Sequence, residues 1–223
     1  MIDLKDESAN YEYYKQPNGR EAGIQITEFD GRPSERQKAI MELLPISCDN
    51  VVDFGCADGS LLIMLIRKWN LKAGYGIDLW RDGVEWGNKY CLENNLKIKL
   101  EEKSILDYSG PFSDIGIMAE VLEHMIDPVE VLKHVFRFVN TLIITLPIKR
   151  PPITQEEIEI LKTRPEEHLT DYSNDAVIAK QLREAGLCIT AKTLTNDGGW
   201  INFVASVSKR NNDLDKYRKY MFK

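Results

Sequence analysis

Residues 51–60 constrain the fold of this chain more than any other segment. Residues 51–54, of which three favour β-structure, follow a polar break and predict a buried strand. Gly55 and Gly59 then provide the backbone angles of a tight turn and, without a Cβ, allow a ligand to approach closely. Apolar residues recur after the turn at helical spacing, at Leu62, Leu65, Ile66 and Trp69. A strand that turns through glycines into a helix predicts a site for a nucleotide-like ligand.

A second predicted strand, residues 72–77, supports this site. Asp78 stands at its carboxyl end. In doubly wound sheets, an acid at this place commonly accepts hydrogen bonds from the hydroxyls of a ribose. An ordinary parallel-sheet turn, with an aspartate that caps the next helix, is the structural alternative.

The glycine spacing discriminates between nucleotides. The dinucleotide motif requires glycine at its first, third and sixth positions, and here the last two are Ala57 and Ser60. Read as Asp-x-Gly-x-Gly-x-Gly, the stretch matches at Asp53, Gly55 and Gly59, and Ala57 replaces the middle glycine. This pattern resembles motif I of the class I S-adenosylmethionine-dependent methyltransferases. The resemblance implies S-adenosyl-L-methionine as the cofactor.

A second motif follows the predicted strand at residues 113–118. Glu-Val-Leu-Glu-His occupies positions 120–124, and Asp127 and Pro128 begin the next helix as its cap and first turn. The run is similar to a large group of small-molecule methyltransferases that includes ubiquinone-pathway and sugar-modifying enzymes. The resemblance extends over residues 33–208 and implies methyl transfer to an oxygen or nitrogen of a small-molecule acceptor.

The order of the elements predicts an α/β fold, a doubly wound, seven-stranded Rossmann-like sheet with an antiparallel last strand. The last two strands are joined by a hairpin signal at residues 196–199. We expect an N-terminal arm or lid at residues 1–32, the methyltransferase domain at 33–208, and a C-terminal tail at 209–223. A substrate-facing insertion is expected at 147–172. Strands are expected at residues 51–54, 72–77, 98–102, 113–118, 141–146, 188–194 and 200–207.

The tyrosines of the arm, Tyr11, Tyr13 and Tyr14, have two interpretations. They pack the arm on the domain, or they form a lid whose aromatic rings cover the cofactor or substrate, as amino-terminal arms often do in the resembled family.

The resemblance also implies which residues surround the cofactor. In this family the loop after the third strand holds the adenine, often through an acid. Ser104 stands at the usual place of that acid and Asp107 lies three positions later, so both registers are open. The implied cofactor-binding residues are Asp53, Gly55, Cys56, Ala57, Gly59, Asp78, Leu79, Ser104, Ile105, Asp107 and Glu120.

His124 and Glu123 are the candidates for a catalytic base, because they leave the fourth strand on the reaction side of the sheet. A sulfonium methyl is already electrophilic, so positioning supplies most of the acceleration. A hydroxyl acceptor additionally needs a base, whereas an amine or thiolate does not. The alternative role for His124 is to brace the cofactor loop.

Two other functions remain open. Small-RNA 2′-O-methyltransferases hold a metal with Glu-x-x-Glu-His and a later histidine, a set that Glu120, Glu123, His124 and His168 can imitate. The acidic sequence pI, about 5.3, and the lack of a second late histidine argue against it, and we expect no metal. A non-catalytic, cofactor-binding regulator is the other alternative.

The composition predicts the cellular setting. The net charge is −6 at pH 7 and no face rich in lysine and arginine stands out, so we do not expect a nucleic-acid partner. The four cysteines lack metal-like spacing and predict a reduced, cytoplasmic protein. The first residues are charged without an apolar core, and the apolar runs are too short to cross a bilayer.

Overall fold

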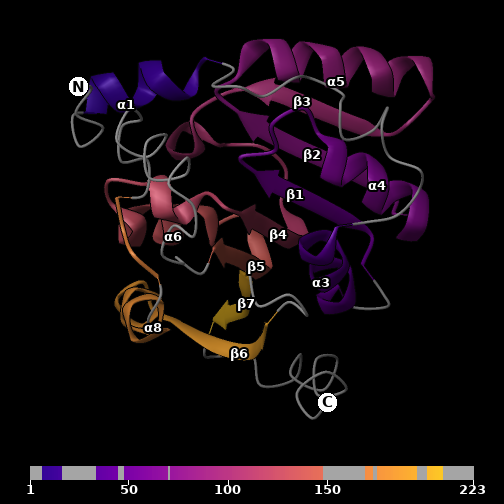
Figure 1. The fold of residues 1–223 in the computed structure, drawn as a ribbon. Helices are drawn as coiled ribbons and strands as arrows, with labels where there is room; N and C mark the ends of the chain where they lie inside the picture. The colour runs from indigo at the N-terminus through magenta and orange to yellow at the C-terminus, as the bar shows by residue number, and fades with distance from the viewer. Residues whose placement is uncertain are drawn as a thin grey trace, which may run out of the picture.

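A sheet of parallel strands forms the centre of the molecule (Figure 1). The computed structural model describes residues 7–16, 34–44, 48–69, 71–147, 169–172, 175–194 and 200–207. The five parallel strands pair in the order β3-β2-β1-β4-β5, so the predicted α/β fold with a parallel, Rossmann-like sheet is confirmed. They are β1 (Asn50–Phe54), β2 (Ala73–Asp78), β3 (Ile98–Glu102), β4 (Ser113–Ala119) and β5 (Val139–Pro147).

An antiparallel pair of strands continues the sheet beyond β5. β7 (Trp200–Val207) runs antiparallel to β5, and β6 (Leu187–Leu194) pairs antiparallel to β7 at the edge. The chain enters β6 from α8 (Asp175–Glu184) through Gly186. Gly186 has a φ of +80°, the left-handed conformation that commonly ends a helix.

Helices cover both faces of the sheet (Figure 1). One face carries α3, α4 and α5, and the other carries α6 and α8. The short 3-10 turns η1 (Ile105–Asp107) and η2 (Leu122–His124) follow β3 and β4, and α1 (Glu7–Tyr14) precedes the domain. The remaining helices are α3 (Glu35–Leu43), α4 (Ser60–Trp69), α5 (Arg81–Glu93) and α6 (Pro128–Val135).

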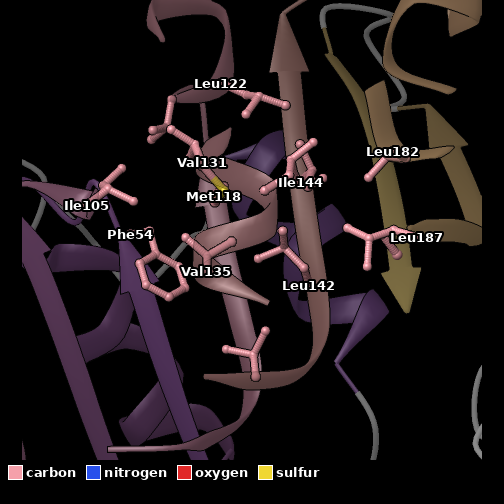
Figure 2. Packing of buried hydrophobic residues seen from close by; sticks show 14 of the residues in the cluster. Phe54, Ile105, Met118, Leu122, Val131, Val135, Leu142, Ile144, Leu182 and Leu187 are labelled. Atoms are coloured by element: carbon pink, nitrogen blue, oxygen red, sulfur yellow. The ribbon is translucent and has the colours of Figure 1, made fainter. Parts of the chain in front are cut away.

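The strands divide their side chains between two hydrophobic cores. Val51 belongs to the core under α3 and α4, whereas Val52 belongs to the core under α6 and α8. Successive side chains of a strand point to opposite faces, so each inner strand feeds both cores. Figure 2 shows the second core, in which Leu142 of β5 and Val135 of α6 belong to one cluster of buried residues. These two cores hold the ends of the inner strands in place.

The strand order reverses between β1 and β4. β2 and β3 lie on one side of β1, and β4 and β5 lie on the other. In open α/β sheets, ligands bind outside the carboxyl ends of the strands at this switch point. The segments that leave β1 and β4, beginning at Gly55 and Glu120, therefore border the expected site.

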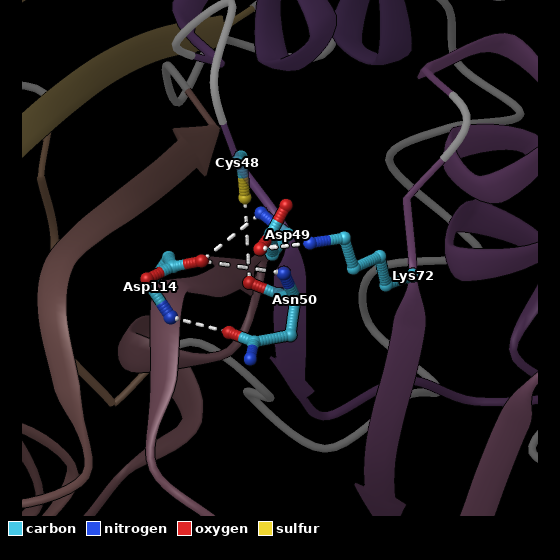
Figure 3. A network of polar contacts seen from close by, with 5 residues as sticks. All are labelled: Cys48, Asp49, Asn50, Lys72 and Asp114. Carbon is cyan, nitrogen blue, oxygen red and sulfur yellow. Dashed lines mark hydrogen bonds and ion pairs between the residues drawn. The ribbon is translucent and has the colours of Figure 1, made fainter.

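A polar network fixes the opposite ends of the same strands (Figure 3). The Asp114 carboxylate accepts hydrogen bonds from the backbone N–H groups of Asp49 and Asn50, at 3.0 and 3.4 Å. The Asp114 N–H donates to Asn50 Oδ1 at 2.8 Å, and Lys72 Nζ lies 2.6 Å from Asp49 Oδ2. The network connects β1, β2 and β4 at their amino ends.

Most predicted strand bounds differ by one or two residues from those in the structure, and the helix that begins at Pro128 is shorter than its apolar spacing suggests. Val139 fits the apolar spacing of the helix after Asp127, but α6 ends at Val135 and Val139 begins β5. A turn through Phe136, whose N–H donates to the carbonyl groups of Leu132 and His134, closes the helix first.

The predicted insertion, apart from 147 and 169–172, and the tail lie outside the described residues, as do 1–6 and 17–32 of the arm.

Candidate active site

The turn after β1 is held against β2 by its backbone. The N–H groups of Gly55 and Cys56 both donate to the Ile77 carbonyl, at 2.8 and 3.0 Å, and the Gly59 N–H donates to the Cys56 carbonyl at 2.8 Å. Gly55, Ala57 and Gly59 have φ angles of +83°, +49° and +75°. For Ala57, which has a Cβ, this left-handed conformation costs about 1–2 kcal/mol. The turn therefore stores strain at the position where the resembled motif has glycine.

A Cβ at either motif glycine would also crowd a neighbouring side chain. A Cβ on Gly55 would collide with Val121, and one on Gly59 would lie 2.7 Å from Leu100 Cδ1. The space beside these glycines is thus filled by side chains of the chain itself. Cys56 is buried, and burial together with the neighbouring acids raises the pKa of its thiol well above the ordinary value. Cys56 is therefore a structural residue without thiolate reactivity.

Asp78 joins the turn to the end of β2. Its Oδ2 accepts a hydrogen bond from the Ala57 N–H at 2.8 Å, and its Oδ1 accepts one from the Trp80 N–H at 2.9 Å. A carboxylate offers about four lone-pair sites, so these contacts do not exclude a ribose hydroxyl. The residue expected to bind ribose thus also supports the loop.

The other predicted cofactor residues follow β2 and β3. The Lys103 N–H donates to the Asp78 carbonyl at 2.9 Å, which brings the loop after β3 beside Asp78. Ile105 is buried in the same core cluster as Phe54, and Ser104 and Leu79 are half-buried. Asp107 is exposed at the end of η1, so the adenine register remains a prediction.

Two carboxyl groups are buried where β1 and β4 end. Asp53 is 2% exposed, and its Oδ1 has no hydrogen-bond partner within the described ranges. Burial raises the pKa of Asp53 to about 7, the Asp78 charge adds to the rise, and the Arg36 charge opposes it. Glu123 is 1% exposed, neither of its carboxylate oxygens has a partner in the described part of the chain, and burial raises its pKa to about 8. Both groups therefore hold a proton much more tightly than exposed acids do.

Arg36 was not predicted from the sequence. It lies in the first turn of α3, which begins with a capping box formed by Ser34 and Gln37. Its guanidinium forms an ion pair with the Glu120 carboxylate, and its charge opposes the raised pKa values of Asp53 and Glu123. Arg36 and Glu120 are 84 positions apart, and no local pattern connects them. The structure therefore places a cation among the three acids at the ends of β1 and β4.

His124 contacts the N-terminal helix. Its Nδ1 lies 2.8 Å from the Tyr14 hydroxyl, and the two ring centroids are 5.2 Å apart. The Asn10 side-chain amide donates to the His124 carbonyl at 3.3 Å. His124 Nε2 lies 4.0 Å from Glu123 Oε1, which is too long for a hydrogen bond. Of the arm tyrosines, Tyr14 reaches a predicted catalytic residue, and Tyr11 is exposed.

The proposed metal set can be followed only in part. Glu120 is paired with Arg36 and Glu123 is buried, while His168 lies outside the described residues. Within the described ranges, no group of three or more histidine, cysteine or acidic side chains is arranged to hold a metal ion. Nor does any helix in those ranges have the length and apolar character to cross a membrane.

Comparison with known proteins gives one relative by sequence and many by structure. A segment of 95 residues, 41% of this chain, is 37% identical to the mitochondrial ubiquinone biosynthesis O-methyltransferase of Saccharomyces cerevisiae and spans 30% of that protein's length. Magnesium protoporphyrin IX methyltransferase from Synechocystis PCC 6803 with bound SAH has a TM-score of 0.66 and 18% identity. The match covers 91% of this chain and 100% of that one. A SAM dependent methyltransferase from Aquifex aeolicus has a TM-score of 0.61 and 16% identity, over 93% of this chain and 100% of that one.

These structural likenesses show a shared fold. The family itself is given by a model described as "Methyltransferase domain", which matches residues 28–203 and so includes the glycine turn, Asp78 and the Glu-Val-Leu-Glu-His motif. This chain belongs to the methyltransferase domain family.

Proposed function

We propose that this protein is an S-adenosylmethionine-dependent methyltransferase that methylates an oxygen or nitrogen of a small-molecule acceptor. The observation that carries the proposal is the left-handed turn at Gly55, Ala57 and Gly59, which Asp78 braces at the switch point of the sheet. Membership of the methyltransferase domain family supports the same conclusion. The structural neighbours with SAM or SAH support the choice of cofactor.

The residues present fit S-adenosyl-L-methionine. Asp53 has a buried carboxylate oxygen without a hydrogen-bond partner in the described ranges, and an ammonium group would provide the missing donor. Arg36 is the cation among these acids and suits the carboxylate of an amino acid, which it would bind in exchange for Glu120. We assign the amino-acid end of the cofactor to Asp53, Arg36 and Glu120.

The nucleoside end is assigned along β2 and β3. Asp78 accepts hydrogen bonds from the ribose while it keeps the Ala57 and Trp80 N–H groups. Leu79 and Ile105 provide apolar contact for the adenine, and Ser104 or Asp107 hydrogen-bonds to its edge. The backbone of residues 55–59, including Cys56, forms the floor between the two ends. When bound, S-adenosyl-L-methionine supplies a methyl group on a sulfonium, which is electrophilic without further activation.

His124 and Glu123 are assigned to the acceptor side. Glu123 is buried and its Oε1 lies too far from His124 Nε2 for a hydrogen bond, so we assign the acceptor to His124 and keep Glu123 as the neighbouring candidate. His124 receives the proton of a hydroxyl acceptor, and an amine acceptor needs no such step. The rest of the site holds the acceptor in line with the methyl group and excludes water, which supplies most of the acceleration.

Several finer assignments belong to the same proposal. The pairing of β5, β7 and β6 supports a seven-stranded sheet with an antiparallel last strand. We assign residues 1–32 to an arm or lid, 33–208 to the catalytic domain with a substrate-facing insertion at 147–172, and 209–223 to a tail. We also propose a cytoplasmic protein with no metal, no nucleic-acid partner and no membrane association.

Methyl transfer from S-adenosylmethionine labelled in its methyl group tests the proposal. The protein is incubated with fractionated small metabolites and with an RNA pool, each with and without a metal chelator. We expect label in a metabolite fraction, unaffected by chelator and, at subsaturating S-adenosylmethionine, reduced in the Asp78→Ala variant. Label in RNA alone, removed by chelator, would establish the RNA alternative. Cofactor binding without label in either pool would indicate a regulator.

A further inference from the structure

We propose that α1 and the segment at residues 169–172 clamp the Glu123–His124 turn together, so that docking of one segment favours docking of the other. The two segments are far apart in the sequence and contact neighbouring residues of the turn. The clamp itself is a property of the fold. Its effect on the reaction rests on the function proposed above, which assigns this turn to the acceptor side.

The turn after β4 is too short to hold its own position. In η2, the His124 N–H donates to the Val121 carbonyl at 3.0 Å, and the Met125 N–H donates to the Leu122 carbonyl at 3.2 Å. A 3-10 turn of this length has poor hydrogen-bond geometry and leaves its last carbonyl groups without a partner inside the helix. The position of the turn therefore depends on the segments that pack around it.

Two distant segments bind the last two carbonyl groups of the turn. The Glu123 carbonyl accepts hydrogen bonds from the N–H groups of Leu169 and Thr170, at 2.7 and 3.2 Å. The His124 carbonyl accepts one from the Asn10 side-chain amide at 3.3 Å. Because peptide groups are planar, the directions of these two carbonyl groups are linked through the φ and ψ angles of His124 alone. A segment that fixes one carbonyl therefore restricts the other.

Each segment has a further anchor. The Tyr14 hydroxyl lies 2.8 Å from His124 Nδ1, a contact that fits either tautomer of the ring, and Tyr13 packs edge-on against Tyr14. On the other side, Tyr172 is buried in the core under α6 and α8, and its hydroxyl donates to Gln181 Oε1 of α8 at 2.6 Å. The clamp thus connects the N-terminal helix to α8 through the turn.

The N-terminal helix is the weaker half of the clamp. α1 has eight residues, and isolated helices shorter than about 12 residues are marginal in water. None of residues 8–16 is fully buried. The docking of α1 therefore depends on its contacts with His124, and α1 should open more readily than the strands do.

Thermodynamic linkage makes the coupling reciprocal. When α1 is docked, it holds His124 in the orientation that presents the Glu123 carbonyl to residues 169 and 170. When those residues are docked, they favour the orientation in which the His124 carbonyl meets Asn10. Asn10 and Tyr14 are therefore positioning residues, which act on the acceptor side through His124.

Hydrogen exchange in the full-length chain, without any ligand, tests the coupling. The amides of Leu169 and Thr170 report on one half of the clamp, and the amide of Val52, inside β1, reports on global unfolding. In the double variant Asn10→Ala/Tyr14→Phe, the amides of Leu169 and Thr170 should exchange about twofold to tenfold faster, the range for one net hydrogen bond. The amide of Val52 should exchange at its wild-type rate.

Tyr11→Phe is the matched control, because it removes a hydroxyl from the exposed side of the same helix. It should leave the exchange of Leu169 and Thr170 unchanged. Unchanged exchange of these two amides in the double variant would overturn the proposal. An equal increase at Val52 would overturn it as well, because the variant would then have lost overall stability and not a local coupling.

The reverse direction is tested from the other half of the clamp. Tyr172→Phe removes the hydrogen bond to Gln181 and should loosen residues 169–172. The amide of Lys15, which donates to the Tyr11 carbonyl at 3.3 Å, should then exchange faster. Tyr90→Phe, which removes a hydrogen-bonded hydroxyl from α5, should leave Lys15 unchanged. If residues 169 and 170 exchange faster in Tyr172→Phe while Lys15 does not, the coupling is refuted, because linkage acts both ways.

Kinetics and binding separate this proposal from the proposed function. With the metabolite fraction that becomes labelled, Asn10→Ala/Tyr14→Phe should lower kcat/KM for the acceptor about threefold to tenfold. Its affinity for S-adenosylhomocysteine should stay within about twofold, because neither residue is assigned to the cofactor. Unchanged kcat/KM would overturn the positioning role and leave the methyltransferase intact. Failure of the wild type to bind S-adenosylhomocysteine would overturn the proposed function and leave the exchange result standing.

Discussion

The substitution Asp53→Asn replaces a carboxyl that the fold buries almost completely with a group of the same shape that cannot ionise. Burial raises the pKa of Asp53 from 3.8 to about 7. The folded chain therefore binds this proton more tightly than the unfolded chain does. The contribution of Asp53 to the free energy of unfolding is highest below pH 4 and falls as pH rises toward 7, because only the unfolded chain ionises easily in that interval.

The magnitude follows from the width of that interval. In this interval each pH unit lowers the contribution of Asp53 to the free energy of unfolding by about 1.4 kcal/mol. The wild type therefore loses about 4 kcal/mol of stability through Asp53 between pH 4 and pH 7. The Asp53→Asn variant lacks this cost. Between pH 5 and pH 8, its stability relative to the wild type should therefore increase by about 3 kcal/mol. Glu123, whose pKa is raised to about 8, is present in both proteins and cancels in the difference.

Urea unfolding at pH 5 and pH 8, followed by tryptophan fluorescence, measures this change. Comparing two pH values removes any constant effect of the amide, such as an unfavourable contact of its N–H₂ group. Asp82→Asn, on the exposed side of α5, controls for the change in net charge. The argument is refuted if the difference in free energy of unfolding between Asp53→Asn and the wild type is the same at both pH values, within about 0.5 kcal/mol. It would mean that Asp53 is ionised and paired in the folded protein.

Three further substitutions probe the turn and its ligand. Ala57→Gly should raise the free energy of unfolding by about 0.5–1 kcal/mol, because relief of the left-handed strain exceeds the entropy cost of glycine; a loss of stability in urea would contradict it. Arg36→Met should weaken S-adenosylhomocysteine binding by about 1.5–3 kcal/mol in calorimetry, while Arg36→Lys keeps part of it; equal affinity in all three proteins would remove Arg36 from the site. Asp78→Asn should cost a similar amount of affinity and also about 1 kcal/mol of stability, because one oxygen acceptor of the Ala57 and Trp80 N–H groups is lost. Unchanged affinity would show that Asp78 serves only the loop.

The glycine turn could be predicted because everything that specifies it is contiguous. A strand, two glycines and an apolar helical face succeed one another within residues 51–69, and the structure forms them in that order. The spacing also showed that Ala57 replaces a glycine. The φ of +49° at Ala57 could not be predicted, because this conformation depends on how Asp78 and Ile77 hold the loop.

The rest of the site comes from contacts between distant segments. Arg36 and Glu120 are 84 positions apart, and Tyr14 and His124 are 110 apart. A lone arginine in a helix and a tyrosine in a polar arm have no local signature that names their partners. The burial of Glu123 could not be predicted from the sequence for the same reason. Its backbone carbonyl accepts hydrogen bonds from the N–H groups of Leu169 and Thr170, at 2.7 and 3.2 Å, and these residues come from another part of the chain.

Val139 illustrates a second reason why part of the fold could not be predicted from the sequence. Its position satisfies both the helical spacing after Asp127 and the start of a strand, and periodicity alone does not discriminate between them. Pairing decides the outcome, because Val139 lies opposite Ser113 in the parallel ladder of β4 and β5.

Calorimetric titration of the purified protein with S-adenosylhomocysteine and, separately, with NAD tests the central claim most directly. The account predicts one molecule of S-adenosylhomocysteine per chain and no heat of binding with NAD, because Ala57 and Ser60 replace two glycines of the dinucleotide motif. Asp78→Ala should weaken the first titration and leave the second unchanged. Binding of NAD, with none of S-adenosylhomocysteine, would contradict the account.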